Sequence, residues 1–284
     1  MTTPAPNTRT GDLNEFLTGR ARQGGRVKTG ISELDEMLRG GFMAGDAVMV
    51  AGGAGLGKTT LALQYLVNGA AKFGEPGVYV TFEELPDQVY RDAKNFGWDL
   101  RQMEDEGKFR IVCTSPSLLV ESDGENILDE PISDLQPRRI VIDSLSHLAM
   151  FVDQRDLRKE AYKIIMHLKT RGLSSLLLWE TLQTAEAPFS VTDGRLSFLV
   201  DCILSMRPVE IDSSLRKALV IQKMRGSDHD KTLREFEITP SGIRVCASFS
   251  GYEGIMTGNP RKSLTEEAAN SWANAFAKNK QRHS

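Results

Sequence analysis

The sequence predicts an α/β fold whose central sheet is mostly parallel, carries helices on both faces, and gains antiparallel strands near its C-terminal edge. Short apolar runs alternate with stretches of helical periodicity as far as about residue 180. From about residue 199, apolar runs follow one another without long helices between them. A glycine-rich turn at 52–57 joins one apolar run to one amphipathic stretch. This alternation is typical of right-handed βαβ units in a parallel sheet covered on both sides.

The expected elements follow the chain in order. A short helix is expected over 31–38, because its apolar residues share one face and Gly40-Gly41 ends it. We expect parallel strands at 47–51, 77–82, 109–113, 139–142 and 174–179. We expect further helices at 59–71, 86–96 and 155–171. We expect antiparallel strands at 199–206, 218–222, 233–238 and 243–245. Residues 115–137 are polar and broken by prolines, and they receive no assignment.

The composition is that of an ordinary globular protein with a slight acidic excess. Of the 284 residues, 40% are hydrophobic and 26% are charged, and the formal net charge is −3. This balance argues against a broad nucleic-acid-binding surface. Cys113, Cys202 and Cys246 lie far apart and form no CxxC pair, so we expect small apolar side chains and no zinc site. No run resembles a signal peptide or is long enough to span a membrane, which predicts a cytoplasmic protein.

The run G-G-A-G-L-G-K-T at 52–59 matches the GxxxxGK[ST] pattern of a phosphate-binding loop, the P-loop. An apolar strand precedes it and an amphipathic helix follows it, as the motif requires. Glycines let backbone N–H groups turn toward a phosphate, and the helix N-terminus adds positive partial charge. We expect Lys58 to reach the β- and γ-phosphates of ATP, and the Thr59 hydroxyl to ligate Mg²⁺. The expected ATP-binding residues here are Gly53, Ala54, Gly55, Leu56, Gly57, Lys58, Thr59 and Thr60.

Acidic residues at two strand ends complete the expected hydrolytic site. Asp143 ends the apolar run 140–142, and we expect it to hold Mg²⁺ directly or through a water. An Asp at this position can also simply cap the next helix. Glu83 and Glu84 follow the strand at 77–82, which we expect to neighbour the P-loop strand. Spacing alone leaves open whether they activate the attacking water or only favour the start of the next helix.

Several motifs resemble the KaiC family of ATPases in the RecA/RadA superfamily. The run T-G-I-x-x-L-D-x-x-L-x-G-G at 29–41, followed by the P-loop, is similar to the beginning of RecA, RadA and KaiC ATPase domains. The pair Glu83-Glu84 is similar to the paired catalytic glutamates of KaiC proteins. The segment K-M-R-G-S-D-H-D-K at 223–231, with R-E-F at 234–236, resembles the second KaiC ATPase domain, and so does 255–260.

The resemblance covers about residues 27–260 and implies a RecA-like P-loop NTPase fold. It divides the chain into three expected parts: a flexible N-terminal tail at 1–25, a RecA/KaiC-like ATPase domain at 26–249, and a C-terminal loop and helix at 250–284. The helix of the last part is expected over 265–278.

The resemblance also implies a homo-oligomeric ring, expected to be a hexamer, with ATP held between subunits. Lys223 and Arg225 would then act across the interface on the neighbour's γ-phosphate, in the manner of arginine fingers. Phe96 would stack near adenine, and Lys217 stands where the family often has an arginine that touches nucleotide. The same segment adds Met224, Ser227, His229 and Lys231 as expected ATP-binding residues. Without the resemblance, 223–231 would be a basic surface turn.

The glutamates and one loop receive roles from the same resemblance. Glu83 would help to bind Mg²⁺ and, with Glu84, would activate the nucleophile. In the clock proteins of the family, the second domain phosphorylates a Ser-Thr pair on the neighbouring subunit. Ser197 matches that serine, but Phe198 replaces the threonine and has no hydroxyl, so a two-site cycle is not expected. Two alternatives remain for this segment: autophosphorylation at Ser197 or at Thr192, or an ordinary loop before a strand.

Three functions follow as hypotheses. The first is a KaiC-like ring ATPase that acts as a signalling switch toward a regulatory protein partner, with serine/threonine autokinase activity left open. The second is a RecA/RadA-type DNA recombination or repair ATPase, although the sequence contains no helix-hairpin-helix domain, zinc finger or large basic excess. The third is a scaffold that binds ATP without hydrolysing it, against which the intact Lys58, Thr59 and Asp143 argue.

Overall fold

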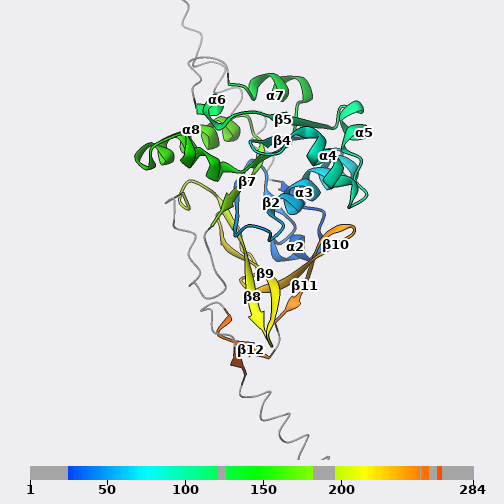
Figure 1. Cartoon of the computed structure of the whole chain (residues 1–284), viewed down its shortest axis with the longest axis vertical. Helices are drawn as coiled ribbons and strands as arrows, with labels where there is room; N and C mark the ends of the chain where they lie inside the picture. The colour runs from blue at the N-terminus through cyan, green and yellow to red at the C-terminus, as the bar shows by residue number, and fades with distance from the viewer. Residues whose placement is uncertain (1–24, 121–125, 182–195, 250, 256–260, 264–284) are drawn as a thin grey trace, which may run out of the picture.

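The computed structural model describes residues 25–120, 126–181, 196–249, 251–255 and 261–263 (Figure 1). Apart from residue 25, the expected N-terminal tail lies outside these ranges, and so does the expected helix at 265–278. The described residues form one large sheet with helices on both faces and two small two-stranded sheets. The predicted fold class is confirmed.

The large sheet has nine strands in the order β11-β10-β9-β8-β3-β7-β6-β4-β5. The parallel strands are β3 (Ala47–Gly52), β4 (Gly77–Thr81), β5 (Phe109–Cys113), β6 (Arg139–Asp143), β7 (Ser174–Glu180) and β8 (Cys202–Ile211). The antiparallel strands are β9 (Ser214–Met224), β10 (Arg234–Thr239) and β11 (Gly242–Ser248). The small sheets pair β1 (Arg26–Val27) with β2 (Phe42–Met43), and β12 (Tyr252–Glu253) with β13 (Arg261–Lys262).

The helices lie in the segments that join these strands. They are α2 (Ser32–Met37), α3 (Lys58–Phe73), α4 (Pro86–Lys94), α5 (Leu100–Asp105), α6 (Pro116–Val120), α7 (Asp129–Leu135) and α8 (Gln154–Thr170), with the 3₁₀ helix η1 at Leu145–Met150. The stretch that the sequence left unassigned thus contains α6 and α7, both too short to show a clear period. The short elements α5 and η1 were not predicted for the same reason.

Two expectations about the sheet are wrong. The strand before the glutamates, β4, does not neighbour the P-loop strand β3, because β7 and β6 lie between them. The first strand after residue 199, β8, is parallel to β3 and not antiparallel, so the antiparallel part begins one strand later, at β9. Strand order depends on pairing between distant segments, and about twenty residues join β7 to β8, which is enough for a parallel crossover.

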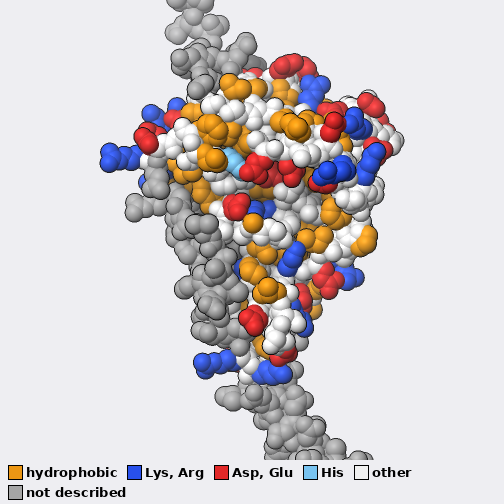
Figure 2. Space-filling model, viewed as in Figure 1, with side chains coloured by type: hydrophobic (Ala, Val, Ile, Leu, Met, Phe, Trp, Pro, Cys, Tyr) orange, Lys and Arg blue, Asp and Glu red, His pale blue; other side chains and the backbone are white. Residues whose placement is uncertain are grey.

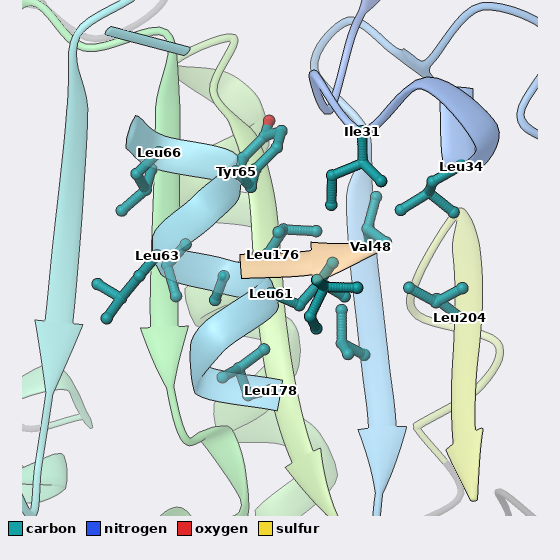
Figure 3. Close-up of a cluster of buried hydrophobic side chains, with 14 of the residues drawn as sticks. Ile31, Leu34, Val48, Leu61, Leu63, Tyr65, Leu66, Leu176, Leu178 and Leu204 are labelled. Atoms are coloured by element: carbon teal, nitrogen blue, oxygen red, sulfur yellow. The ribbon is translucent and has the colours of Figure 1, made fainter. Parts of the chain in front are cut away.

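The core has two layers, one on each face of the sheet. Alternate residues of β3 point to opposite faces, so Val48 and Val50 pack with α2 and α3, whereas Met49 and Ala51 pack with α8. Figure 3 shows the first layer, with Leu61 of α3 lying against β3. Each fully buried aliphatic side chain stabilises the fold by about 2 kcal/mol. The P-loop therefore connects two elements that are fixed by packing.

Candidate active site at the carboxyl ends of the strands

The P-loop backbone takes a conformation that its glycines make accessible. Gly55 and Gly57 have φ values of 72° and 97°, in the left-handed region where a side chain is strained. A Cβ on Gly57 would also lie 2.8 Å from the Ile238 side chain, and a Cβ on Gly52 would lie 2.7 Å from the Met206 carbonyl oxygen. The loop ends at the first turn of the 16-residue helix α3, whose free N–H groups favour a bound anion. This geometry suits a phosphate chain.

Two lysines from different elements lie beside the P-loop. The Lys58 Nζ donates a hydrogen bond to the Gly53 carbonyl oxygen at 2.8 Å, and the Lys217 Nζ donates one to the Gly55 carbonyl oxygen at 3.1 Å. Burial lowers the pKa of Lys58, while Glu180 and Asp143 oppose that shift. Burial likewise lowers the pKa of Lys217. A polyphosphate would offer both ammonium groups stronger acceptors than these carbonyl oxygens.

Asp143 ends β6 and accepts two hydrogen bonds on one oxygen. The Thr59 hydroxyl and the Tyr79 hydroxyl each donate to its Oδ2, both at 2.7 Å. Burial raises the pKa of Asp143, although these two donors and Lys58 act in the opposite direction. A carboxylate and a hydroxyl this close supply the hard oxygen donors that Mg²⁺ prefers, with phosphate and water oxygens for the rest of its shell. The residues present therefore fit the expected ion.

The two glutamates differ in exposure and in partners. The Glu83 side chain is 69% exposed, and its Oε1 hydrogen-bonds the Nε2 of His147. Glu84 is half-buried, and burial, followed by the charge of Asp143, raises its pKa. Its backbone N–H donates to the Thr81 hydroxyl at 3.1 Å, which fixes the turn after β4. Although β4 is not next to β3, it pairs with β6, so its glutamates share one edge of the sheet with Asp143.

Phe96 lies in the turn after α4 and stacks on Trp98. Their ring centroids are 4.8 Å apart and the ring planes differ by 26°. Trp98 in turn packs next to Gly242, where a Cβ would lie 2.8 Å from the indole ring. Both aromatic side chains are half-buried.

Lys223 and Arg225 lie near the amino ends of the parallel strands, whereas the P-loop lies at their carboxyl ends. The Lys223 Nζ donates to the carbonyl oxygens of Ser197 and Val200, at 2.7 and 2.6 Å. The Arg225 guanidinium donates to the Phe198 carbonyl oxygen at 2.8 Å. Strand β9 runs from Lys217, beside the P-loop, to Lys223, six residues and about 20 Å away. Within one chain these two cations cannot reach a nucleotide bound at the P-loop.

The rest of the 223–231 segment is fixed to the beginning of the described chain. The Ser227 hydroxyl accepts a hydrogen bond from Arg26, Arg39 pairs with Asp228 at 3.3 Å, and the Asp230 N–H donates to the Met37 carbonyl oxygen at 2.8 Å. The remaining expected residues differ in exposure: Met224 is buried, His229 is half-buried with a buried Nδ1 that has no hydrogen-bond partner in the described structure, and Lys231 is exposed. The expected segment is thus held together as a unit.

Comparison with known proteins identifies the family of this chain. The family model described as "ATPase: KaiC" matches residues 27–250. The chain belongs to the KaiC ATPase family. The circadian clock oscillator protein KaiC of Parasynechococcus marenigrum is 34% identical over 242 residues, which are 85% of this chain and 47% of that protein. KaiC of Rippkaea orientalis is 33% identical over 268 residues, 92% of this chain and 51% of that protein. The chain thus spans about half the length of the curated relatives it matches.

A solved KaiC-like protein shares the fold. The crystal structure of a KaiC-like protein from Pyrococcus horikoshii superimposes with a TM-score of 0.70 at 33% sequence identity, covering 78% of this chain and 99% of that one. The KaiC-type ATPase domain is therefore established by sequence and by structure, and ATP is the nucleotide that the family binds. Among the described residues, no helix is long and apolar enough to cross a membrane.

The two expected phosphorylation sites differ in what the structure describes. Ser197 is half-buried, in a turn where its carbonyl oxygen accepts from Lys223. Thr192 lies outside the described residues. Arg158 stacks on the neighbouring Phe198, with the guanidinium carbon 4.0 Å from the ring centre.

Sequence reasoning missed three residues of this KaiC-type site: Tyr79, His147 and Glu180. Tyr79 lies inside an apolar strand, where a buried aromatic side chain is the ordinary expectation. His147 belongs to the unpredicted η1. Glu180 ends β7, next to the P-loop strand, and its charge acts on Lys58. An acidic residue at the end of an apolar strand was a usable signal for Glu180, whereas only the fold reveals the other two. Figure 2 shows acidic side chains gathered beside a histidine on one face of the molecule.

Proposed function

We propose that this chain hydrolyses ATP with Mg²⁺ at the interfaces of a head-to-tail homo-oligomeric ring, expected to be a hexamer. The observation that carries the proposal is that the P-loop lies at the carboxyl ends of the parallel strands, whereas Lys223 and Arg225 lie near their amino ends. A site that needs both sets can be completed only by two subunits that associate through different surfaces. Heterologous association of this kind closes into a ring when the rotation allows it.

Hydrolysis then uses the described groups in separate roles. The P-loop N–H groups and Lys58 bind the β- and γ-phosphates. Thr59 and Asp143 would hold Mg²⁺, with Glu83 reaching it through a water, and the ion would supply charge neutralisation. Glu83 accepts the proton of a water that it orients together with Glu84. The oxygen of this water attacks the γ-phosphorus, while the bond from that phosphorus to the β–γ bridging oxygen breaks. Lys223 and Arg225 of the next subunit stabilise the charge that develops, and the products are ADP and phosphate.

Other residues bind the adenine ring and supply further contacts to the nucleotide. Phe96, with its neighbour Trp98, offers a stacking surface for adenine. Lys217 contributes a second cation from the same subunit as the P-loop. Met224, Ser227, His229 and Lys231 approach the nucleotide together with the finger residues, since the segment that carries them is fixed as a unit.

The output we propose is a nucleotide-dependent regulatory switch in the cytoplasm that acts on a protein partner. The comparisons reported above are all with KaiC proteins, which favours this function over DNA recombination. Autophosphorylation at Ser197 or Thr192 is the additional activity to test. An intact-mass measurement after incubation with ATP, with Ser197→Ala and Thr192→Ala as controls, decides it.

Mixing two inactive variants tests the shared site. Lys58→Ala disables the P-loop, and Arg225→Ala removes the finger, so each variant alone should lose ATP hydrolysis. In a random one-to-one mixture, about a quarter of the interfaces join an intact P-loop to an intact finger, and about a quarter of the wild-type rate should return. Native mass with and without Mg²⁺-ATP reports the assembly. A mixture as inactive as its components, or a protein that stays monomeric with ATP, would overturn the shared site.

A further inference from the structure

A chain of hydrogen bonds joins the ends of three neighbouring strands near Glu83. Strands β7, β6 and β4 lie side by side in the sheet and end at the same edge. The Glu180 N–H, at the end of β7, donates to the Ser146 hydroxyl at 3.4 Å. That hydroxyl contacts the Ser144 hydroxyl directly after β6, and Ser144 Oγ lies 3.2 Å from the Nδ1 of His147. The other ring nitrogen of His147 bonds the Glu83 carboxylate after β4.

This series of hydrogen bonds ends at the Glu83 carboxylate, which has few other contacts. The Glu83 side chain is 69% exposed, and among the described residues His147 is the one side chain that hydrogen-bonds it. An exposed glutamate without such a contact would sample several rotamers. The His147 side chain, in contrast, is only 17% exposed, and its ring packs edge-on against Phe82 at 6.2 Å between centroids. A fixed group therefore holds a mobile one.

The direction of the hydrogen bonds follows from their chemistry. An ionised carboxylate can only accept, so the Nε2 of His147 carries a proton and donates to Glu83. On the other side of the ring, Nδ1 lies 3.2 Å from the Ser144 hydroxyl oxygen and 3.1 Å from the Ser144 carbonyl oxygen, so Ser144 holds the imidazole in place. The bond occupies Oε1 of Glu83 and leaves Oε2 without a described partner.

We propose that His147 is a positioning residue that holds the Glu83 carboxylate in the orientation needed to take a proton from the attacking water. The proposal rests on the proposed function, in which Glu83 acts in ATP hydrolysis. His147 touches neither the nucleotide nor the water, and it neither gains nor loses a proton in the step. The Oε2 atom of Glu83 accepts the proton as the water oxygen bonds to phosphorus. If the carboxylate were displaced by about 1 Å from that position, the rate of ATP hydrolysis would fall by at most roughly 10²-fold.

Two substitutions separate positioning from packing. His147→Leu keeps an apolar side chain against Phe82 but removes the donor, and we expect kcat to fall about tenfold while KM for ATP stays within about twofold. His147→Gln keeps an N–H donor near the position of Nε2 and should restore kcat to within about threefold of wild type. His167→Leu, at a histidine of α8 whose contacts are with Asp129 and Arg171, is the matched control and should keep the wild-type kcat.

A double substitution asks whether His147 acts through Glu83. If it does, adding His147→Leu to Glu83→Gln should change kcat no further, because the group being positioned is already gone. Imidazole ¹⁵N spectra give a readout without ATP, because the chain has only four histidines. Glu83→Gln should shift the His147 resonance and leave the His167 resonance in place. An unshifted His147 resonance, or equal losses for the Leu and Gln variants, would overturn the proposal.

Failure of the proposed function has a different signature. If the wild-type protein does not hydrolyse ATP, the proposed function is wrong and the positioning role falls with it. If the wild type hydrolyses ATP and His147→Leu has the same kcat, only the positioning role is wrong.

Discussion

Replacing Asp46 with Asn should stabilise the nucleotide-free protein at neutral and alkaline pH but not in acid. Asp46 lies just before β3, and its Oδ2 is buried without a hydrogen-bond partner in the described structure. Burial, followed by the charge of Asp201, raises the pKa of Asp46 from 3.8 to about 7, although Lys169 and Arg225 oppose the shift. Burial, followed by the charges of Asp46 and Asp201, raises the pKa of the nearby Cys202 thiol to about 12.

The sign follows from linkage. Below pH 3.8 the carboxyl is protonated in both the folded and the unfolded chain, and it contributes nothing to the pH dependence. Between pH 3.8 and about 7 the unfolded chain loses the proton more readily, so the folded state loses stability as the pH rises. Above about pH 7 the destabilisation is complete and constant. Asn carries no proton to lose and removes this dependence.

The magnitude follows from the size of the shift. A shift of about 3 units corresponds to about 4 kcal/mol as an upper limit. Since Asp46 is only half-buried, solvent screening reduces the expected gain to about 1–2 kcal/mol. Urea unfolding of the two proteins at pH 4, 6 and 8 measures it, with the exposed Asp105→Asn as a control for charge removal. The difference in free energy of unfolding should grow with pH, and curves that stay parallel across this range would refute the reasoning.

Three further substitutions test the candidate site. Tyr79→Phe removes one of the two donors to Asp143 and should lower the free energy of unfolding by about 1–3 kcal/mol in urea; an unchanged midpoint would contradict a contribution from this bond. Gly57→Ala should weaken ATP binding about tenfold with an unchanged far-UV circular dichroism spectrum, since its φ of 97° strains any side chain; wild-type affinity would show that the loop relaxes freely. Lys217→Ala should not recover activity when mixed with Lys58→Ala, because both lysines serve the same P-loop; recovery would place Lys217 across the interface.

The sequence predicts local features of this site well and long-range ones poorly. The P-loop, with Lys58 and Thr59, was readable because its chemistry lies in eight consecutive residues between a strand and a helix. The sequence also predicts Asp143 near Thr59, because an acid that ends a parallel strand lies at the same ends of the strands as the P-loop. The position of β4 in the sheet was not predictable from the sequence, because strand order is set by pairing between segments that are distant in the chain.

The supporting side chains show the same limit. Tyr79 looks like a core residue, and only the fold shows its hydroxyl on Asp143. His147 lies in a six-residue 3₁₀ helix that carries no periodic signal, and its contact with Glu83 spans 64 positions. The roles of Lys223 and Arg225 came from the family resemblance, and the structure adds that they lie far from the P-loop of their own chain.

Strand β9 links two different nucleotides in the proposed ring. Its first half carries Lys217 against the P-loop of its own subunit, and its far end carries Lys223 toward the nucleotide of the next. The strand pairs with β8 from 214 to 224 and with β10 at 217–219, so the large sheet connects its two ends. A displacement of the P-loop on phosphate release would therefore move the finger residues at the adjacent site. ATP hydrolysis would then proceed in order around such a ring, because phosphate release at one site changes the position of the finger residues at the next.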